Sequence, residues 1–371
     1  MTNMKKVIFC TNLPSPYRVD FFNEFGKYCD LTVLYERHSS AERNAAWKGT
    51  DAVNFKEVYL DLKLVGVDRS RGNALRKYVK QHPSDVLIFT NYVSPATMEA
   101  ILWCRLHGRH YYIEFDGGFN KKDSFLKGLL KRFLLRGAKG HLTTANEHIK
   151  YLESLGIPQN RIHKYPFTSI SEKNIIDLNG ITNEFKKEIR ENLGITESKV
   201  VLAVGQMIYR KGIDILLKAS VGLGNNLGVY IVGGKATKEI LEQKDSLRLN
   251  NVHFVDFKTK TELSKYYLAA DVFVFPTRED IWGLVVNEAM ANGLPVVSSC
   301  RSIAAQEMIV SGVNGIMAEA EVPQSFHNAI KKILNNSSLV EEMRINSLAK
   351  SKDYTIEKMA QAHQKLLIES L

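Results

Sequence analysis

Residues 271–298 read DVFVFPTREDIWGLVVNEAMANGLPVVS, and this stretch decides the fold. Its first six residues, 271–276, form a short apolar run that a proline stops, which predicts a buried parallel strand. A loop follows, and residues 284–291 then have the pattern of a helix that Gly293 and Pro295 close. Ligands in open α/β sheets bind where such strands end, so the loop is a candidate binding site.

The loop and the start of this helix carry groups that suit a sugar nucleotide. We expect the free amides of Gly283, Leu284 and Val285 to face the mouth of the strand, where they and the positive helix end attract phosphate. Glu288 lies five residues beyond Gly283, about 7 Å along a helix, which is a sensible distance from a pyrophosphate to its ribose hydroxyls. Asp280 stands on the loop, toward the sugar. As an isolated acidic pair, these two carboxylates would only cap and solvate a helix.

A second strand-to-helix turn supports the first. Residues 200–206 form another buried apolar run, and a helical pattern resumes after Gly212. Arg210 and Lys211 stand at the turn between them. Two adjacent cations at such a turn suit an anionic ligand, although the same residues alone would be a common surface turn.

Apolar strands alternate with helical stretches along the whole chain, which predicts an α/β protein with parallel sheets. The chain of 371 residues is long enough for two such domains. We expect a Rossmann-like domain over residues 1–168 and another over 169–354, with residues 165–169 as the link. Strand signals occur at 6–10, 31–35, 85–89, 111–115 and 140–143, then at 200–206, 228–234, 252–257 and 271–276.

The stretch from 277 to 298 resembles the E-x7-E motif of retaining GT-B glycosyltransferases, especially family 4 (group 1) of the bacterial polysaccharide type. The segments Glu-Ala-Met-Ala at 288–291 and Pro-Val-Val at 295–297 stand where that family has them. The first glutamate of the motif is Asp280 here, which keeps the charge but is one methylene shorter. By this resemblance Asp280 contacts the transferred sugar, with Glu279 as the alternative.

The resemblance, strongest over about 195–320, also implies a fold and a donor site. The fold is two Rossmann-like domains facing across a cleft, the first for the acceptor and the second for the nucleotide sugar. The last helix, about 355–371, packs back onto the first domain. Arg210 and Lys211 would neutralise the diphosphate as it leaves, and the backbone at Phe257 and Lys258 would seat the base.

Residues 11–18, TNLPSPYR, replace the glycine-rich turn that many family members have after the first strand. They resemble a variant found in bacterial polysaccharide transferases, which would place Ser15 and Arg18 at the cleft, toward the donor. Equally, the two prolines would stiffen a loop, and Arg18 would be a helix-start residue packed on the surface.

Residues 114–120 follow a strand and contain two glycines that allow close backbone approach. Asp116 or Glu114 would therefore contact the acceptor hydroxyl or the transferred sugar. Many relatives place a histidine in this region, and this chain has none there. The alternative is that Asp116 is a plain turn aspartate.

All the net positive charge lies in the first half: residues 1–165 hold 26 Lys and Arg against 16 Asp and Glu, while residues 166–371 hold 24 of each. Much of it falls in 121–139, a predicted helix with an apolar stripe flanked by cations. Such a helix can lie on an anionic membrane surface, where each basic group contributes about 1 kcal/mol, and a lipid-linked acceptor would require this. The alternative is a helix that buries its stripe in the core. The stripe is Phe125, Leu126, Leu129, Leu130, Phe133 and Leu134, and its cations are Lys127, Lys131, Arg132 and Arg136.

Several classes of function lack the signals that they need. The apolar run at 7–10 is too short for a secretory signal, and no stretch approaches the roughly 20 apolar residues of a spanning helix, so we expect a cytoplasmic protein, peripheral on the inner face of the membrane. The four cysteines form no C-x-x-C pair, which excludes a recognisable zinc site. Walker, H-E-x-x-H, G-x-S-x-G and Asp-x-Asp sequences are absent, so we expect no metal and no cofactor besides the donor itself.

The resemblance thus implies a retaining hexosyltransferase, and we expect it to need no metal. By the family resemblance, it would move a sugar from a nucleotide diphosphate, UDP, onto a sugar hydroxyl of a lipid-linked glycan in cell-surface polysaccharide synthesis. The leaving phosphate would take the acceptor proton, so no side-chain base is needed. A GT-B epimerase acting on a UDP-sugar, which needs no acceptor, is the alternative. Nucleic-acid binding is disfavoured, because the aromatics of 121–139 lie in an apolar stripe rather than among the cations.

Overall fold

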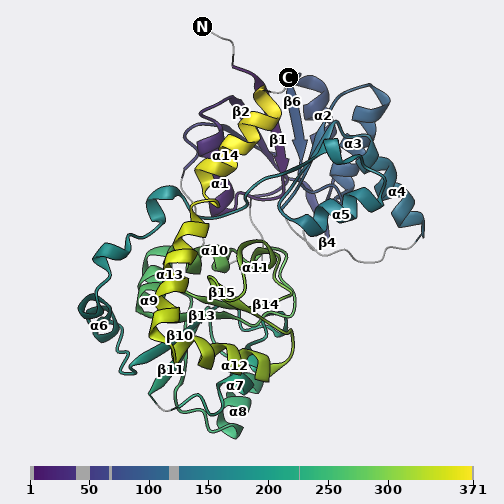
Figure 1. Cartoon of the computed structure of the whole chain (residues 1–371). Coiled ribbons are helices and arrows are strands. Elements are labelled where there is room, and N and C mark those ends of the chain that lie inside the picture. Colours follow the sequence, from purple (N-terminus) through teal and green to yellow (C-terminus); the bar gives the residue numbers. More distant parts are fainter. Residues whose placement is uncertain (1–3, 39–50, 67–68, 117–124, 225, 370–371) are drawn as a thin grey trace. The chain divides into compact units, whose positions relative to one another are not determined.

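The computed structural model describes residues 4–38, 51–66, 69–116, 125–224 and 226–369. The chain divides into two compact units (Figure 1). Unit 1 comprises Met1–Ser169 together with Thr355–Leu371, and unit 2 comprises Ile170–Tyr354. Each unit has its own parallel sheet with helices packed on it.

Unit 2 holds a six-stranded parallel sheet in the order β12-β11-β10-β13-β14-β15. The chain runs from the central β10 outward to β12 and then returns to β13 on the other side of β10. This reversal creates a topological switch point between β10 and β13, the place where open α/β sheets bind ligands. The strands are β10 (Lys199–Val204), β11 (Leu227–Val232), β12 (Val252–Val255), β13 (Val272–Phe275), β14 (Val296–Ser299) and β15 (Gly315–Ala318).

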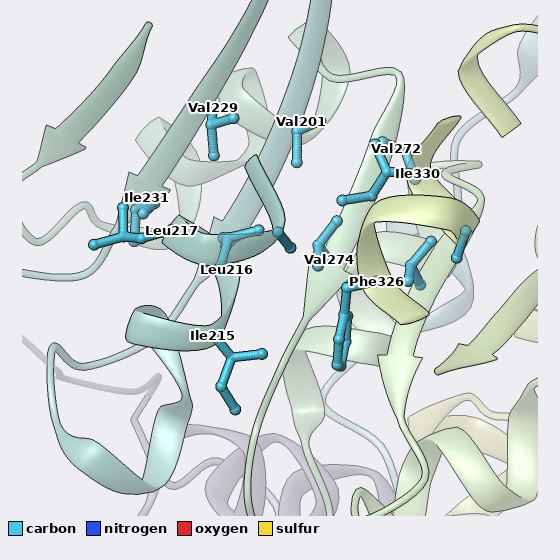
Figure 2. Close-up of a cluster of buried hydrophobic side chains, with 14 of the residues drawn as sticks. Val201, Ile215, Leu216, Leu217, Val229, Ile231, Val272, Val274, Phe326 and Ile330 are labelled. Carbon is cyan, nitrogen blue, oxygen red and sulfur yellow. The ribbon is translucent and has the colours of Figure 1, made fainter. Parts of the chain in front are cut away.

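Apolar side chains, most of them from the sheet and from two helices, build a large buried cluster in unit 2 (Figure 2). In the sheet, Val201 lies between Val229 of β11 and Val272 of β13. The helices α7 (Ile213–Ser220) and α12 (Pro323–Leu334) close over this row with Leu216 and Phe326, both fully buried. Each such side chain contributes about 1.5–3 kcal/mol by leaving water, which anchors the loops at the carboxyl ends of the strands.

The other helices of unit 2 begin at clear sequence signals. Thr259 and Glu262 form a capping box at the start of α9 (Lys260–Ala269). The predicted helix at 284–291 is α10 (Leu284–Ala291), which begins after Gly283. The remaining elements are α6 (Asn183–Asn192), α8 (Lys238–Ser246), α11 (Ile303–Met308) and α13 (Ser337–Ser351), with short 3₁₀ turns at Glu172–Asn174, Leu178–Gly180 and, as η4, at Tyr209–Lys211.

Unit 1 repeats the same design with a seven-stranded parallel sheet in the order β3-β2-β1-β6-β7-β8-β9. Its switch point therefore lies between β1 and β6. The strands are β1 (Lys6–Thr11), β2 (Asp30–Tyr35), β3 (Lys56–Tyr59), β6 (Val86–Phe89), β7 (Tyr112–Phe115), β8 (Gly140–Thr143) and β9 (Ile162–Lys164), with a separate antiparallel pair β4 (Lys63–Gly66) and β5 (Arg69–Arg71).

The C-terminal helix belongs to unit 1. Figure 1 shows α14 (Ile356–Gln364, yellow) beside α1 (Pro16–Phe25), and the two helices are in contact. A π-helical turn, Lys365–Glu369, follows α14. The other helices are α2 (Ala74–Gln81), α3 (Pro95–Leu106), α4 (Phe125–Arg136) and α5 (Asn146–Ser154), with a 3₁₀ turn at Gln159–Arg161. Within the described residues, none of the helices has the length and apolar character needed to cross a membrane.

Candidate functional site

Two loops meet at the switch point of unit 2, the turn η4 after β10 and the loop 276–283 after β13. The carbonyl of Arg210 accepts a hydrogen bond from the amide of Arg278 at 2.8 Å and another from the hydroxyl of Thr277 at 2.9 Å. Gly212, at φ 69°, ends the turn, and a Cβ there would lie 2.0 Å from the carbonyl oxygen of Pro276. Only glycine permits this approach, so the position of one loop fixes the other.

The joined loops bring three predicted residues together. Lys211 Nζ donates to Asp280 Oδ2 at 2.5 Å, and an Arg210 guanidinium nitrogen donates to the same oxygen at 3.2 Å. Arg210 also donates to the carbonyl of Glu279 at 2.9 Å. The side chain of Lys211 is 16% exposed and that of Asp280 12%, whereas that of Arg210 is 45% exposed. The result is a carboxylate held between two cations at the edge where a ligand would bind.

Arg278 of the second loop holds η4 and α7 in place through its guanidinium. The sequence alone did not indicate these contacts. Its two terminal nitrogens each donate to one oxygen of Asp214, both at 2.7 Å, and its Nε donates to Glu321 at 3.0 Å. The guanidinium lies 3.8 Å from the centre of the Tyr209 ring. Burial alone would raise the pKa of Asp214, but the hydrogen bond and the charge of Arg278 lower it. The charged pair therefore stays ionised and rigid.

The N-terminus of α10 opens at the same edge. Gly283 has φ 100°, and a Cβ there would lie 2.9 Å from both the Phe275 ring and the Ser302 hydroxyl. The first intrahelical bond runs from the amide of Val286 to the carbonyl of Gly283 at 2.8 Å. The amides of Gly283, Leu284 and Val285 precede that bond, so the helix offers them no acceptor and its dipole makes this end positive. The end of the helix therefore has the character of an anion site.

Glu288 lies one turn further along α10. Its Oε2 accepts a hydrogen bond from the phenol of Tyr267 on α9 at 2.9 Å. Phe257 and Lys258 stand at the same edge of the sheet, in the loop between β12 and α9, and Phe257 is 37% exposed. Lys258 Nζ is 3.9 Å from Glu262 of α9, so this side chain lies along α9.

In unit 1, Arg18 is buried rather than free to meet a ligand. It is 2% exposed and donates to Glu114 at 2.6 Å and to Asp116 at 3.0 Å. The interpretation of Arg18 as a helix-start residue on the surface is therefore wrong. Ser15, which precedes α1, is also 2% exposed. The side chain of Asp116, another predicted residue of unit 1, is 42% exposed and is therefore accessible to solvent.

Glu114 is the centre of a buried network that the sequence did not reveal. Besides Arg18 it binds the phenol of Tyr165 at 2.9 Å and His363 Nε2 of α14 at 2.9 Å. Burial alone would raise the pKa of Glu114, but the charge of Arg18 and the hydrogen bond from His363 outweigh it and lower the pKa to about 2. The network ties α14 to the strand that presents Asp116.

The basic segment 121–139 is partly described. Residues 121–124 lie outside the described residues, and α4 begins at Phe125. The predicted apolar stripe is divided: Leu134 is buried, whereas Leu129, Leu130 and Phe133 are 45–46% exposed. The interpretation as a helix with its stripe wholly in the core is therefore wrong for these three side chains.

Comparisons with known proteins show which sequences and structures the chain resembles. Residues 185–350 match the model of the family described as glycosyl transferases group 1. A curated relative, the capsular polysaccharide biosynthesis glycosyltransferase CapM of Staphylococcus aureus, is 28% identical over 179 residues, which cover 47% of this chain and 45% of CapM. The chain spans about half the length of the curated relatives that it matches.

Solved structures match nearly the whole chain. A glycosyltransferase from Rickettsia africae superposes with a TM-score of 0.78 at 14% identity, over 98% of both chains. The Anabaena protein HepE, solved in complex with UDP, superposes with a TM-score of 0.75 at 17% identity, over 99% of this chain and 100% of HepE. At such identities the likeness shows the fold alone. The predicted fold class is thus confirmed: the chain has the GT-B fold, and its C-terminal unit carries the match to glycosyl transferases group 1.

Proposed function

We propose that this chain is a retaining, metal-independent glycosyltransferase that moves a sugar from a UDP-sugar to a sugar hydroxyl of a lipid-linked glycan in cell-surface polysaccharide synthesis. One observation carries the proposal: Arg210, Lys211, Asp280 and the N-terminus of α10 meet at the switch point of unit 2. This arrangement combines positive charge for a diphosphate with a carboxylate for a sugar hydroxyl. The glycosyltransferase relatives and the UDP complex of HepE support the choice of substrate.

The donor would lie along the edge of the sheet of unit 2. The diphosphate would be bound by Arg210, Lys211 and the amides of 283–285. The carboxylate of Glu288 would accept hydrogen bonds from the ribose hydroxyls. The backbone at Phe257 and Lys258 seats the base. Asp280 receives a hydroxyl of the transferred sugar. Two cations and a helix end supply the positive charge that a divalent metal provides in other transferases, and this supports metal independence.

The reaction itself needs little from the side chains. The acceptor oxygen attacks the anomeric carbon while the bond from that carbon to the phosphate oxygen breaks, and the bonding electrons leave with UDP. The departing phosphate oxygen takes the acceptor proton on the same face, which retains the anomeric configuration. Lys211 and Arg210 stabilise the charge that grows on the phosphate. Asp116 of unit 1 would bind the acceptor, held in place by buried Arg18.

In this proposal, unit 1 binds both the acceptor and the membrane surface. The protein would be cytoplasmic and peripheral on the membrane. The half-exposed Leu129, Leu130 and Phe133 lie on α4 among cations such as Arg132 and Arg136. An apolar row flanked by positive charge suits the interface of an anionic bilayer. Vesicles containing phosphatidylglycerol should therefore retain the protein, and replacing the three apolar residues by serine should release it. Equal retention by neutral vesicles would contradict the anionic surface.

Nucleotide release tests the transferase assignment. UDP-, GDP- and dTDP-sugars are offered with and without an extract of lipid-linked oligosaccharide, each in the presence and in the absence of a chelator. We expect release from one UDP-sugar that requires the extract, and its loss in Glu288→Ala and Lys211→Ala. Lys218→Ala is the matched control, because Lys218 is exposed on α7 and its loss removes the same charge elsewhere.

Two results of this assay would overturn the proposal. Conversion of a donor without acceptor and without nucleotide release would identify an epimerase. Release that stops on chelation would contradict metal independence. The anomeric configuration of the product, read by proton NMR, decides whether the reaction retains it.

A further inference from the structure

A buried tyrosine stands behind the carboxylate of Glu288. Tyr267 lies on α9 and is 2% exposed, and its hydroxyl is 2.9 Å from Glu288 Oε2 on the neighbouring α10. Glu288 itself is half-buried. The ring of Tyr267 packs against Phe273 of β13, with the ring centres 5.9 Å apart. The sheet therefore fixes where the phenol points.

The direction of this hydrogen bond follows from its surroundings. Burial, and then the charge of Glu288 and the hydrogen bond to it, raise the pKa of Tyr267 well above its ordinary value. The phenol thus remains protonated and donates, and the carboxylate accepts. A buried donor to a charged acceptor forms one of the stronger hydrogen bonds in proteins.

We propose that Tyr267 is a positioning residue that fixes the carboxylate of Glu288 for the vicinal hydroxyls of a ribose. The inference rests on the proposed function, because it takes Glu288 as the ribose acceptor. Without the phenol, Glu288 loses a hydrogen bond from a fixed donor, so more rotamers are open to its side chain and a ligand must select one of them at a cost in affinity. Tyr267 thereby favours a ribonucleoside diphosphate over its deoxy analogues.

Isothermal titration of the whole protein with UDP and with 2′,3′-dideoxy-UDP tests the inference. Tyr267→Phe removes only the hydroxyl and keeps the ring packing. Tyr266→Phe is the matched control, since Tyr266 is the adjacent buried tyrosine and projects from a different face of α9. We expect Tyr267→Phe to weaken UDP about tenfold, to leave dideoxy-UDP unchanged, and to have no further effect when Glu288 is already alanine. Tyr266→Phe should change neither affinity.

Each other outcome overturns a distinct statement. If Tyr267→Phe lowers the affinity for both ligands equally, Tyr267 only packs and the inference is overturned. The same follows if Tyr267→Phe binds UDP as tightly as the wild type while Glu288→Ala no longer binds UDP. If Glu288→Ala binds both ligands like the wild type, or the wild type binds no UDP, the assignment of the donor site is overturned and the inference with it. Thermal unfolding of each variant shows whether it has kept its fold. Among the folded variants, the effect of Tyr267→Phe in the Glu288→Ala protein separates positioning from packing.

Discussion

The carboxylate of Asp280 contacts both of the cations that the proposed function assigns to the donor diphosphate. Its Oδ2 lies 2.5 Å from Lys211 Nζ and 3.2 Å from Arg210. We predict that Asp280→Asn binds UDP more tightly than the wild type and transfers sugar more slowly. The substitution removes the internal competitor for the cations, and it also removes the carboxylate proposed to hold the donor sugar.

The size of the effect follows from the burial of the three groups. Lys211 and Asp280 are 16% and 12% exposed, so water screens their attraction only in part, whereas Arg210 at 45% is well screened. Two charges about 4 Å apart attract by about 4 kcal/mol at an effective dielectric of about 20. Desolvation reduces such hydrogen bonds between charged groups to about 1.5–3 kcal/mol net. Because asparagine still accepts one weaker bond, we expect a gain of about 1–2 kcal/mol, or roughly 5–30-fold in affinity for UDP.

Calorimetry with UDP and steady-state release of nucleotide from the UDP-sugar measure the two effects. Glu279→Gln is the matched control, because it removes one negative charge from the adjacent residue and leaves the contact between Asp280 and Lys211. The gain in Asp280→Asn should shrink as salt is added, since added ions screen the freed cations. A folded Asp280→Asn protein that binds UDP no more tightly than the wild type, or a Glu279→Gln protein with the same gain, would refute the reasoning.

Three further predictions concern the parts that hold the site. Arg278→Lys keeps the charge but loses the paired bonds to Asp214, so nucleotide release should fall about tenfold; an unchanged rate would show that the loops hold without it. Gly212→Ala should lower the free energy of unfolding in urea by about 3 kcal/mol, because its Cβ meets the Pro276 carbonyl, whereas Gly194→Ala, with a similar φ of 70° and open space, should cost about 1 kcal/mol. Glu114 has its pKa lowered to about 2, so the stability that it contributes, about 3 kcal/mol, is present at neutral pH and is lost as pH falls from about 4.5 to 2. Glu114→Gln should flatten the acid limb of a stability-against-pH curve, and an unaltered limb would contradict the shift.

The α/β fold could be predicted because the central strands are continuous apolar runs bounded by proline, glycine and polar loops. β10 and β13 are of this kind: β13 is buried along its length, and β10 is buried over its four central residues. The edge strand β3, with the sequence KEVY, was not predicted, because a short half-exposed strand needs few apolar residues. The short β14 (VVSS) and β15 (GIMA) were also not named as strands, since their apolar runs are shorter than the VFVF run of β13.

The residues of the proposed donor site were predicted from short motifs, and the residues that hold them in place were not. Arg210, Lys211 and Asp280 were chosen separately, and the structure brings them together because their strands are neighbours. Arg278 and Tyr267 were missed. An arginine in a loop and a tyrosine in a helix have no special pattern, and each acquires a role only through the residue that it contacts.

The sequence by itself determined the alternation of strands and helices, the positions of the turns, and the chemical character of the residues at those turns. These properties depend on neighbours within a few positions, through backbone preference and the burial of one face. Only the tertiary structure decided which turns meet. It joins His363 to Glu114 across 249 residues and Arg278 to Asp214 across 64, because packing places distant segments side by side. The burial of Arg18 was decided in the same way, since its charge is tolerated in the interior only where Glu114 and Asp116 neutralise it.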